Sequence, residues 1–112
     1  MNAESLAEHL FRETRGDAGV VVVGCGWEGH RASEDEAAAG AILDRLRSRG
    51  AKLNEQAGHI VEGYLARSRK ALKSNSAARR LERLGYGRDL DFCLAEDTVP
   101  VVPRLAGGAF VG

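Results

Sequence analysis

The stretch over residues 20–40, VVVVGCGWEGHRASEDEAAAG, constrains the fold of this chain more than any other. It begins with four valines, continues through a glycine-rich turn and ends at the acidic start of a helix. An apolar, β-branched run without polar alternation is typical of a strand covered on both faces, as in parallel sheets flanked by helices. We therefore predict a central strand at Val20–Val23, followed by a turn and a helix.

Cap residues and apolar spacing predict five helices. The expected ranges are Asn2 to about Arg15, Ser33–Ser48, Asn54 to about Lys73, Ser76–Leu84 and Asp89–Leu94. Asn2 and Asn54 are suitable N-caps, and Ser33 stands three residues before Glu36, which is the capping-box spacing. Glycines just beyond the second and fourth helices, at positions 50 and 85, are suitable C-terminal stops.

The C-terminal segment has strand character that proline restricts. Residues 98–102 look strand-like, but Pro100 and Pro103 lack an N–H, so this segment is expected at a sheet edge. Residues 105–111, with Gly107 and Gly108 at the centre, indicate a hairpin or a loose tail. The fold class expected from these elements is α/β, in one domain over residues 1–112 whose helices flank a small, largely parallel or mixed sheet.

Composition excludes several classes of partner. Sixteen basic and sixteen acidic residues cancel, which argues against nucleic acid and anionic membranes. No run approaches the roughly 20 apolar residues of a membrane span, and an N-terminus carrying Glu4 and Glu8 does not resemble a signal peptide. The default location is therefore cytoplasmic. Two cysteines, Cys25 and Cys93, are too few for a disulfide framework and agree with a reducing compartment.

The glycine-rich turn matches a dinucleotide-binding pattern only superficially. Gly24, Gly26 and Gly29 satisfy G-x-G-x-x-G after a strand. In that fingerprint the helix opens at the motif itself, whereas residues 30–32 intervene here before Ser33. The acidic residue expected about twenty positions on would be near Asp44, inside the second helix. The simpler interpretation is that the glycines permit a tight turn.

The first turn of the second helix carries three acidic residues, Glu34, Asp35 and Glu36. One interpretation is structural, because carboxylates stabilise a helix N-terminus by about 0.3–1 kcal/mol each. The other is a divalent cation site, since Mg²⁺ takes one or two carboxylates together with waters and a substrate phosphate. In that case the free amides of the glycine turn can face the phosphate. The residues by themselves leave both interpretations open.

Other chemically active side chains each have a plain alternative. Cys25 is a nucleophile candidate or a packed small residue, and His30 is a phosphate donor or acid, or an exposed loop histidine. Arg80, with its neighbour Arg79, can hold a phosphate or be solvated, while Trp27 can shape a pocket or cover the sheet edge. Cys93 is expected in the core.

A group of short motifs resembles those of the 2-phosphosulfolactate phosphatases of coenzyme M biosynthesis and their bacterial relatives. The matching segments, in order, are Asn2-Ala3, Gly26-Trp27-Glu28-Gly29, Glu34-Asp35, Ala39-Gly40, Arg80-Leu81, Leu84-Gly85, Asp89-Leu90, Phe92-Cys93 and Val102-Pro103. Each motif is weak alone, but their order and spacing extend over essentially the whole chain.

The resemblance implies a layered α/β/α sheet fragment and a Mg²⁺-dependent phosphatase that removes phosphate from a small phosphorylated hydroxy acid. On this basis Glu34 and Asp35 are expected metal ligands, and Gly26, Glu28, Gly29 and Arg80 are expected to bind substrate. Family members are about twice as long, and this chain resembles their C-terminal half. A truncated enzyme, a non-catalytic remnant or subunit that binds a small anion, a complementing N-terminal chain and a homo-oligomer all stay open.

Overall fold

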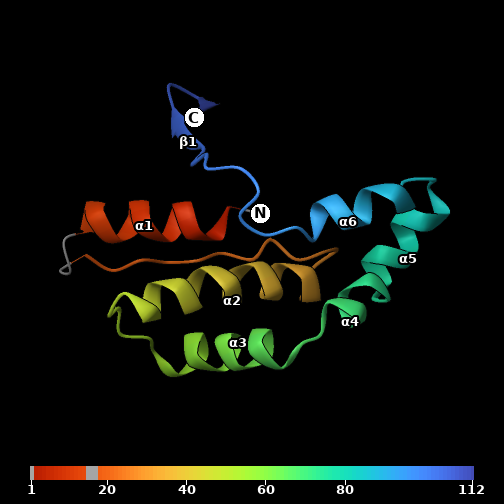
Figure 1. Ribbon diagram of the computed structural model, residues 1–112, viewed down its shortest axis with the longest axis horizontal. Helices are drawn as coiled ribbons and strands as arrows, with labels where there is room; N and C mark the ends of the chain where they lie inside the picture. Colours follow the sequence, from red (N-terminus) through yellow and green to blue (C-terminus); the bar gives the residue numbers. More distant parts are fainter. Residues whose placement is uncertain (1, 15–17) are drawn as a thin grey trace.

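The computed structural model describes residues 2–14 and 18–112, and this part of the chain is mainly helical (Figure 1). The helices are α1 (Ala3–Thr14), α2 (Ser33–Ser48), α3 (Glu55–Ala66), α4 (Arg69–Lys73), α5 (Ser76–Arg83) and α6 (Leu90–Cys93), with a 3-10 turn η1 (Gly87–Asp89). Two short strands follow, β1 (Arg104–Ala106) and β2 (Ala109–Val111). The predicted end of the first helix at residues 15–17 lies outside the described residues.

The core lies where α2 packs between α1 and α3 (Figure 1). The buried apolar residues in these three helices are mostly small: Ala3, Ala7, Ala37, Ala41, Leu46 and Val61. Small side chains allow the helix axes to approach closely. Gly40 is the clearest case, because a Cβ atom there would lie 2.3 Å from Cβ of Tyr64 on α3.

The N-terminus of α2 differs from its prediction. The N-cap residue is Ala32, and no side chain forms the cap hydrogen bond, so the predicted capping box of Ser33 and Glu36 is wrong. Both side chains have tertiary partners instead. Ser33 Oγ accepts a hydrogen bond from Asn75 Nδ2 at 2.9 Å, and Glu36 Oε1 accepts one from Arg31 Nε at 2.7 Å.

The predicted long helix from Asn54 to Lys73 is two helices. Asn54 caps α3 as predicted, accepting the Ala57 N–H at 2.8 Å, but α3 ends at Ala66. Arg67 is extended, and Ser68 then caps α4 by accepting the Ala71 N–H at 3.1 Å. The predicted C-terminal stops at Gly50 and Gly85 are confirmed, with φ of +98° and +84°.

The expected sheet is only partly present. Residues 105–111 form the predicted hairpin, in which Arg104 pairs with Val111 and Ala106 with Ala109, but residues 98–102 form no strand. Val20–Val23 is not a strand in the described part of the chain, because no other strand runs beside it to complete a ladder. The α/β class agrees with the structure, whereas the parallel or mixed layered sheet stays a prediction. None of the described helices has the length and apolar character of a membrane span.

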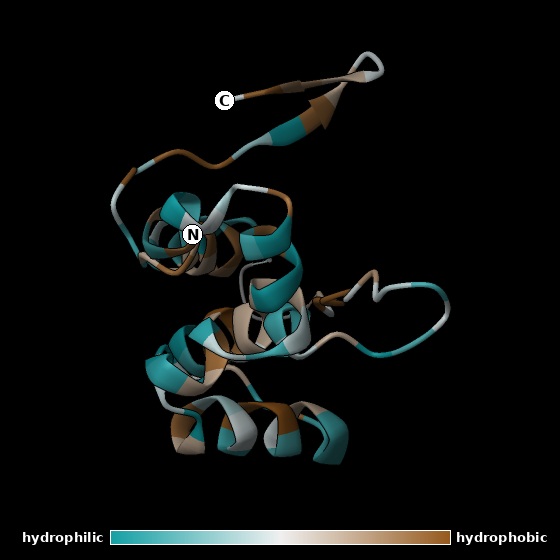
Figure 2. Cartoon of the chain, turned by 90° about the vertical axis from the view of Figure 1, so that its right-hand side faces the viewer, coloured by the Kyte–Doolittle hydropathy of each residue, from teal (hydrophilic) through white to brown (hydrophobic). Residues whose placement is uncertain are grey.

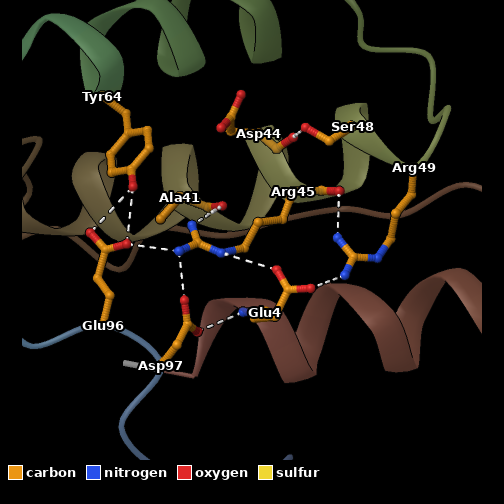
Figure 3. Close-up of polar contacts among 9 residues, drawn as sticks. All are labelled: Glu4, Ala41, Asp44, Arg45, Ser48, Arg49, Tyr64, Glu96 and Asp97. Carbon is orange, nitrogen blue, oxygen red and sulfur yellow. Dashed lines mark hydrogen bonds and ion pairs between the residues drawn. The ribbon is translucent and has the colours of Figure 1, made fainter.

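A polar cluster fastens the segment after α6 to the helical core (Figure 3). Arg45 on α2 donates to Glu96 Oε2 at 2.9 Å and to Asp97 Oδ2 at 2.6 Å. Tyr64 Oη on α3 donates to the same Glu96 oxygen at 3.0 Å, and Glu4 on α1 forms ion pairs with Arg45 and Arg49. Although partial burial opposes it, the pKa of Arg45 is raised because Tyr64, Glu96 and Asp97 stabilise the charged form.

Candidate functional site

The glycine-rich turn is a tight hairpin-like loop at residues 27–30. The N–H groups of Trp27 and His30 each donate to the other's carbonyl oxygen at 2.9 Å. The two central residues, Glu28 and Gly29, have φ of +49° and +80°, as a type I′ turn requires. Gly26 also has a positive φ, +70°, and a Cβ there would lie 2.4 Å from the His30 carbonyl oxygen. Glycine at 26 is therefore required by both conformation and space.

Asp35, in the first turn of α2, holds this turn in place. Its Oδ2 atom accepts the Gly26 N–H at 2.7 Å, so one predicted metal ligand is directly bonded to one predicted substrate-binding residue. Cβ of Asp35 also lies 3.3 Å from the position that a Cβ of Gly24 would occupy. The glycines let the extended chain pass close to the N-terminus of α2.

Glu34 connects α2 with the start of α5. Its Oε2 atom accepts from Asn75 Nδ2 at 3.2 Å and from the adjacent Ser33 hydroxyl at 3.4 Å. Asn75 is at the same time the N-cap of α5, where its Oδ1 atom accepts the Ala78 N–H at 2.8 Å. A single asparagine side chain thus fixes the position of α5 relative to the acidic turn.

Arg80 on α5 lies over the glycine-rich turn. Its guanidinium carbon is 3.8 Å from the centroid of the Trp27 ring, a cation–π contact. Arg80 and Trp27 are both exposed to solvent, so the guanidinium keeps hydrogen-bonding capacity for an anion. The structure therefore brings Arg80 beside the turn that carries Gly26, Glu28 and Gly29.

Arg67 is a site residue that sequence analysis missed. Its side chain donates to the Ser33 carbonyl oxygen, and its Nη2 atom lies 3.7 Å from Glu36 Oε2, so it places a positive charge beside the acidic turn. In the sequence, Arg67 falls inside the single helix predicted from Asn54 to about Lys73. That helix is broken before Ser68, which caps the next helix, α4. Because of this break, the Arg67 side chain can turn back to α2.

The two carboxylates suit a hard cation but do not form a complete site. Within the described residues, Glu34 and Asp35 each make their hydrogen bonds through one oxygen, Oε2 and Oδ2. The second oxygen of each can ligate Mg²⁺, which accepts one or two protein carboxylates. The same residues contain no group of three or more His, Cys, Asp or Glu side chains placed to hold a metal ion.

A cavity of about 780 Å³ lies beside the turn, bounded by residues 19–26, the N-terminal half of α2 and the start of α3. Gly26, Gly29 and Asp35 line it, whereas Glu28, Glu34 and Arg80 do not. The predicted site residues therefore converge on one region from two sides of the turn. Cys25 and Cys93 are both exposed, so the expectation that they are packed is wrong, and His30 is exposed as expected.

Comparison with known proteins gives one consistent family. The family model for 2-phosphosulpholactate phosphatase matches residues 1–108. Proteins named probable 2-phosphosulfolactate phosphatase are 31% identical in Thermotoga petrophila and 32% identical in Thermotoga maritima, each over 99% of this chain. A relative of the same name in Synechococcus sp. (strain WH7803) is 36% identical over 91% of the chain and 43% of its own length.

The matched region is the C-terminal part of these relatives. It amounts to 48% of each Thermotoga protein, so the chain spans about half the length of the curated relatives it matches. The match covers the glycine-rich turn, the acidic start of α2 and Arg80. This chain belongs to the 2-phosphosulfolactate phosphatase family.

Proposed function

We propose that this chain supplies the C-terminal part of the active site of a Mg²⁺-dependent phosphatase, acting on 2-phosphosulfolactate or a similar small phosphorylated hydroxy acid. The observation that carries the proposal is the convergence of three separate segments, residues 26–29, 33–36 and 75–80, through the Gly26–Asp35 and Glu34–Asn75 hydrogen bonds and the Arg80–Trp27 contact. The names of the relatives support the substrate class.

In this proposal Glu34 and Asp35 hold the cation through their second carboxylate oxygens. Mg²⁺, when bound, neutralises charge on the phosphoryl oxygens. The Glu28 and Gly29 N–H groups donate no hydrogen bond within the described residues, so the exposed end of the turn can meet the substrate phosphate. Gly26 allows the tight turn because it has no Cβ. Arg80 contributes a positive charge, and its contact with the Trp27 ring positions the guanidinium.

The chemistry needs groups beyond these residues. No nucleophile or general base is assigned within the described residues, and the exposed Cys25 and His30 have no activating partner there. We propose that those groups come from the N-terminal portion of the relatives, which this chain does not match. The Mg²⁺ dependence and the substrate can be examined in a fusion that places the N-terminal portion of the Thermotoga maritima relative before this chain.

The test measures phosphate release from 2-phosphosulfolactate and from an aryl phosphate, with Mg²⁺ and with EDTA. We expect activity in the fusion that EDTA removes and that Glu34→Gln and Asp35→Asn each reduce at least about 100-fold, since metal-held charge supplies several kcal/mol of stabilisation. Asp44→Asn is the matched control: Asp44 is a carboxylate of α2 that pairs with Arg47 at 2.6 Å, outside the acidic turn. Full activity in both site variants would reject the metal assignment.

A second candidate is a non-catalytic subunit that binds a small anion or pairs with a complementing chain. It is favoured by the incomplete carboxylate set of the described residues and by the unpaired segment at Val20–Val23. This candidate predicts no phosphate release from the fusion or from the chain alone at any Mg²⁺ concentration. It also predicts that inorganic phosphate binds to the chain alone in calorimetry and that Arg80→Ala weakens that binding.

A further inference from the structure

The extended segment Val20–Val23 leaves most of its apolar surface in contact with solvent. Val21 is 84% exposed and Val23 is 76% exposed, whereas Val22 is only partly exposed. The cavity between the segment and the helices is lined by Val20, Val21 and Val22, but not by Val23. Alternate side chains of an extended chain point to opposite faces. One face of the segment is therefore directed toward the helices, and the other is uncovered.

The backbone of the segment is also unpaired. Within the described residues, Val20–Val23 forms no backbone hydrogen bond, although the chain is extended there. In Figure 1 the segment runs along the helical layer formed by α1, α2 and α3, with no strand beside it. A row of unpaired N–H and C=O groups of this kind is a template for strand addition.

The other apolar strands of this chain do not supply the missing pairing. The hairpin β1–β2 stands away from the helices in both views and pairs only with itself (Figure 2). Its apolar residues Leu105 and Phe110 are 68% and 76% exposed. Among the described residues of one chain, no strand pairs with Val20–Val23, so a partner strand would have to come from another polypeptide segment.

Two possible partners for the unpaired edge of Val20–Val23 can be compared on physical grounds. A second copy, pairing edge to edge through its own Val20–Val23, would satisfy backbone groups but would leave the outward faces of Val21 and Val23 uncovered. A larger α/β unit can add strands at the edges and helices over that face, which is the environment that a valine run without polar alternation indicates. The relatives contain about as much chain again beyond the matched part, which is long enough to form such a unit.

We propose that Val20–Val23 is the acceptor edge for a parallel β-strand from the polypeptide that corresponds to the unmatched N-terminal portion of the family, whether that portion is continuous with this chain or separate. Pairing there would place the incoming strand beside the glycine-rich turn. Residues at the carboxyl end of that strand would then reach the acidic start of α2, the edge where open α/β sheets bind ligands. The inference rests on the proposed function, which needs groups from that portion.

The test is amide hydrogen exchange in the full chain alone and in its fusion behind the N-terminal portion of the Thermotoga maritima relative. We expect the amides of residues 20–23 to exchange rapidly in the chain alone and at least about 100-fold more slowly in the fusion, since a paired strand opens only with its surrounding unit. The double variant Val21→Lys/Val23→Lys should remove this protection. The amide of Val61, fully buried on α3, reports whether the helices stay folded in every sample.

The matched control is Leu65→Lys/Phe92→Lys, which also replaces two exposed apolar residues, 58% and 75% exposed, but on α3 and α6. It should leave residues 20–23 protected in the fusion. Rapid exchange of these residues in the fusion, or protection that survives the valine double variant, would overturn the proposal. Concentration-dependent protection in the chain alone would assign the edge to a second copy and would overturn it as well.

The same fusion separates this inference from the proposed function. Protection of residues 20–23 without phosphatase activity would support the acceptor edge and count against the enzyme. Phosphatase activity with residues 20–23 unprotected would support the enzyme and reject the edge. The two proposals can therefore fail independently.

Discussion

Asp97 Oδ1 accepts the backbone N–H of Glu4 at 2.7 Å, although 93 residues separate them (Figure 3). The first turn of α1 thus receives an acceptor from the far end of the chain. Sequence analysis expected Asn2 to cap this helix, but the Asn2 side chain donates to the Val101 carbonyl oxygen instead. Both contacts fasten the segment after α6 onto α1, and Asp97 adds a hydrogen bond from Arg45 at 2.6 Å.

Replacing this carboxylate should destabilise the chain. Asp97→Ala removes an acceptor from the N-terminus of α1 and leaves Arg45 with fewer partners, so we expect a loss of about 1–3 kcal/mol in the free energy of unfolding. Urea unfolding followed by circular dichroism measures it. Asp91→Ala is the control: Asp91 pairs with Lys73 on the surface, where an ion pair contributes at most about 1 kcal/mol. Equal losses in the two variants would contradict the role given to Asp97.

The same carboxylate should make stability depend on pH. Partial burial opposes the shift, but the Glu4 N–H and Arg45 hold the pKa of Asp97 below its usual value of 3.8. The stabilisation that the ionised Asp97 carboxylate gives to the folded state is therefore fully present above the usual pKa of 3.8. It is lost as the pH falls through the lower pKa of Asp97 in the folded state. We expect Asp97→Asn to flatten the decline in the free energy of unfolding between about pH 5 and pH 2. A profile as steep as that of the parent chain would contradict the assignment.

Gly40 should not tolerate a side chain. A Cβ there would lie 2.3 Å from Cβ of Tyr64 and 2.9 Å from the Ile60 carbonyl oxygen, so Gly40→Ala must separate α2 from α3. We expect a loss of about 1–3 kcal/mol, even though alanine favours helices. Gly63→Ala, on α3 with no neighbouring atom within 4 Å of the place its Cβ would take, should instead gain up to about 1 kcal/mol. Thermal unfolding of both variants distinguishes packing from helix propensity.

Gly26 should be equally intolerant, but for a backbone reason. Its φ of +70° and the His30 carbonyl oxygen both exclude a Cβ, so Gly26→Ala should distort the turn and weaken the bond to Asp35. We expect a cost of about 1–3 kcal/mol and a change in tryptophan fluorescence, because Trp27 is the only tryptophan of the chain. Gly58→Ala on α3, where space is open, serves as the control and should leave the emission unchanged.

The contact between Arg80 and Trp27 should affect spectroscopy more than stability. Both residues are exposed, so Arg80→Ala is expected to cost less than about 1 kcal/mol. It should nevertheless make Trp27 more accessible to an added quencher, because it removes the guanidinium that covers the ring at 3.8 Å. Arg79→Ala, the neighbouring residue that donates to the Ser74 carbonyl oxygen, should leave quenching unchanged. Identical quenching in the two variants would contradict the contact.

Predictions from local rules succeeded where the relevant atoms are close in sequence. Asn54 caps its helix as predicted, because its side chain meets the N–H of Ala57, three residues ahead. Gly50 and Gly85 end theirs because glycine adopts the positive φ needed there. The capping box at Ser33 failed, since Asn75 and Arg31 offered its two side chains other hydrogen-bonding partners. The Asn75 contact comes from 42 residues away, so the local pattern around Ser33 cannot indicate it.

The sequence by itself determined most helix bounds and indicated the C-terminal hairpin, because caps, glycines and apolar spacing act over a few residues. Only the tertiary structure decided that Asp35 bonds to Gly26, that Arg80 stacks on Trp27 and that Arg67 turns back to α2. It also decided that Val20–Val23 lies unpaired among the residues that the structure describes. β-Branched residues make a segment extended, but a strand needs a partner to satisfy its N–H and C=O groups, and no pattern within the segment can supply one.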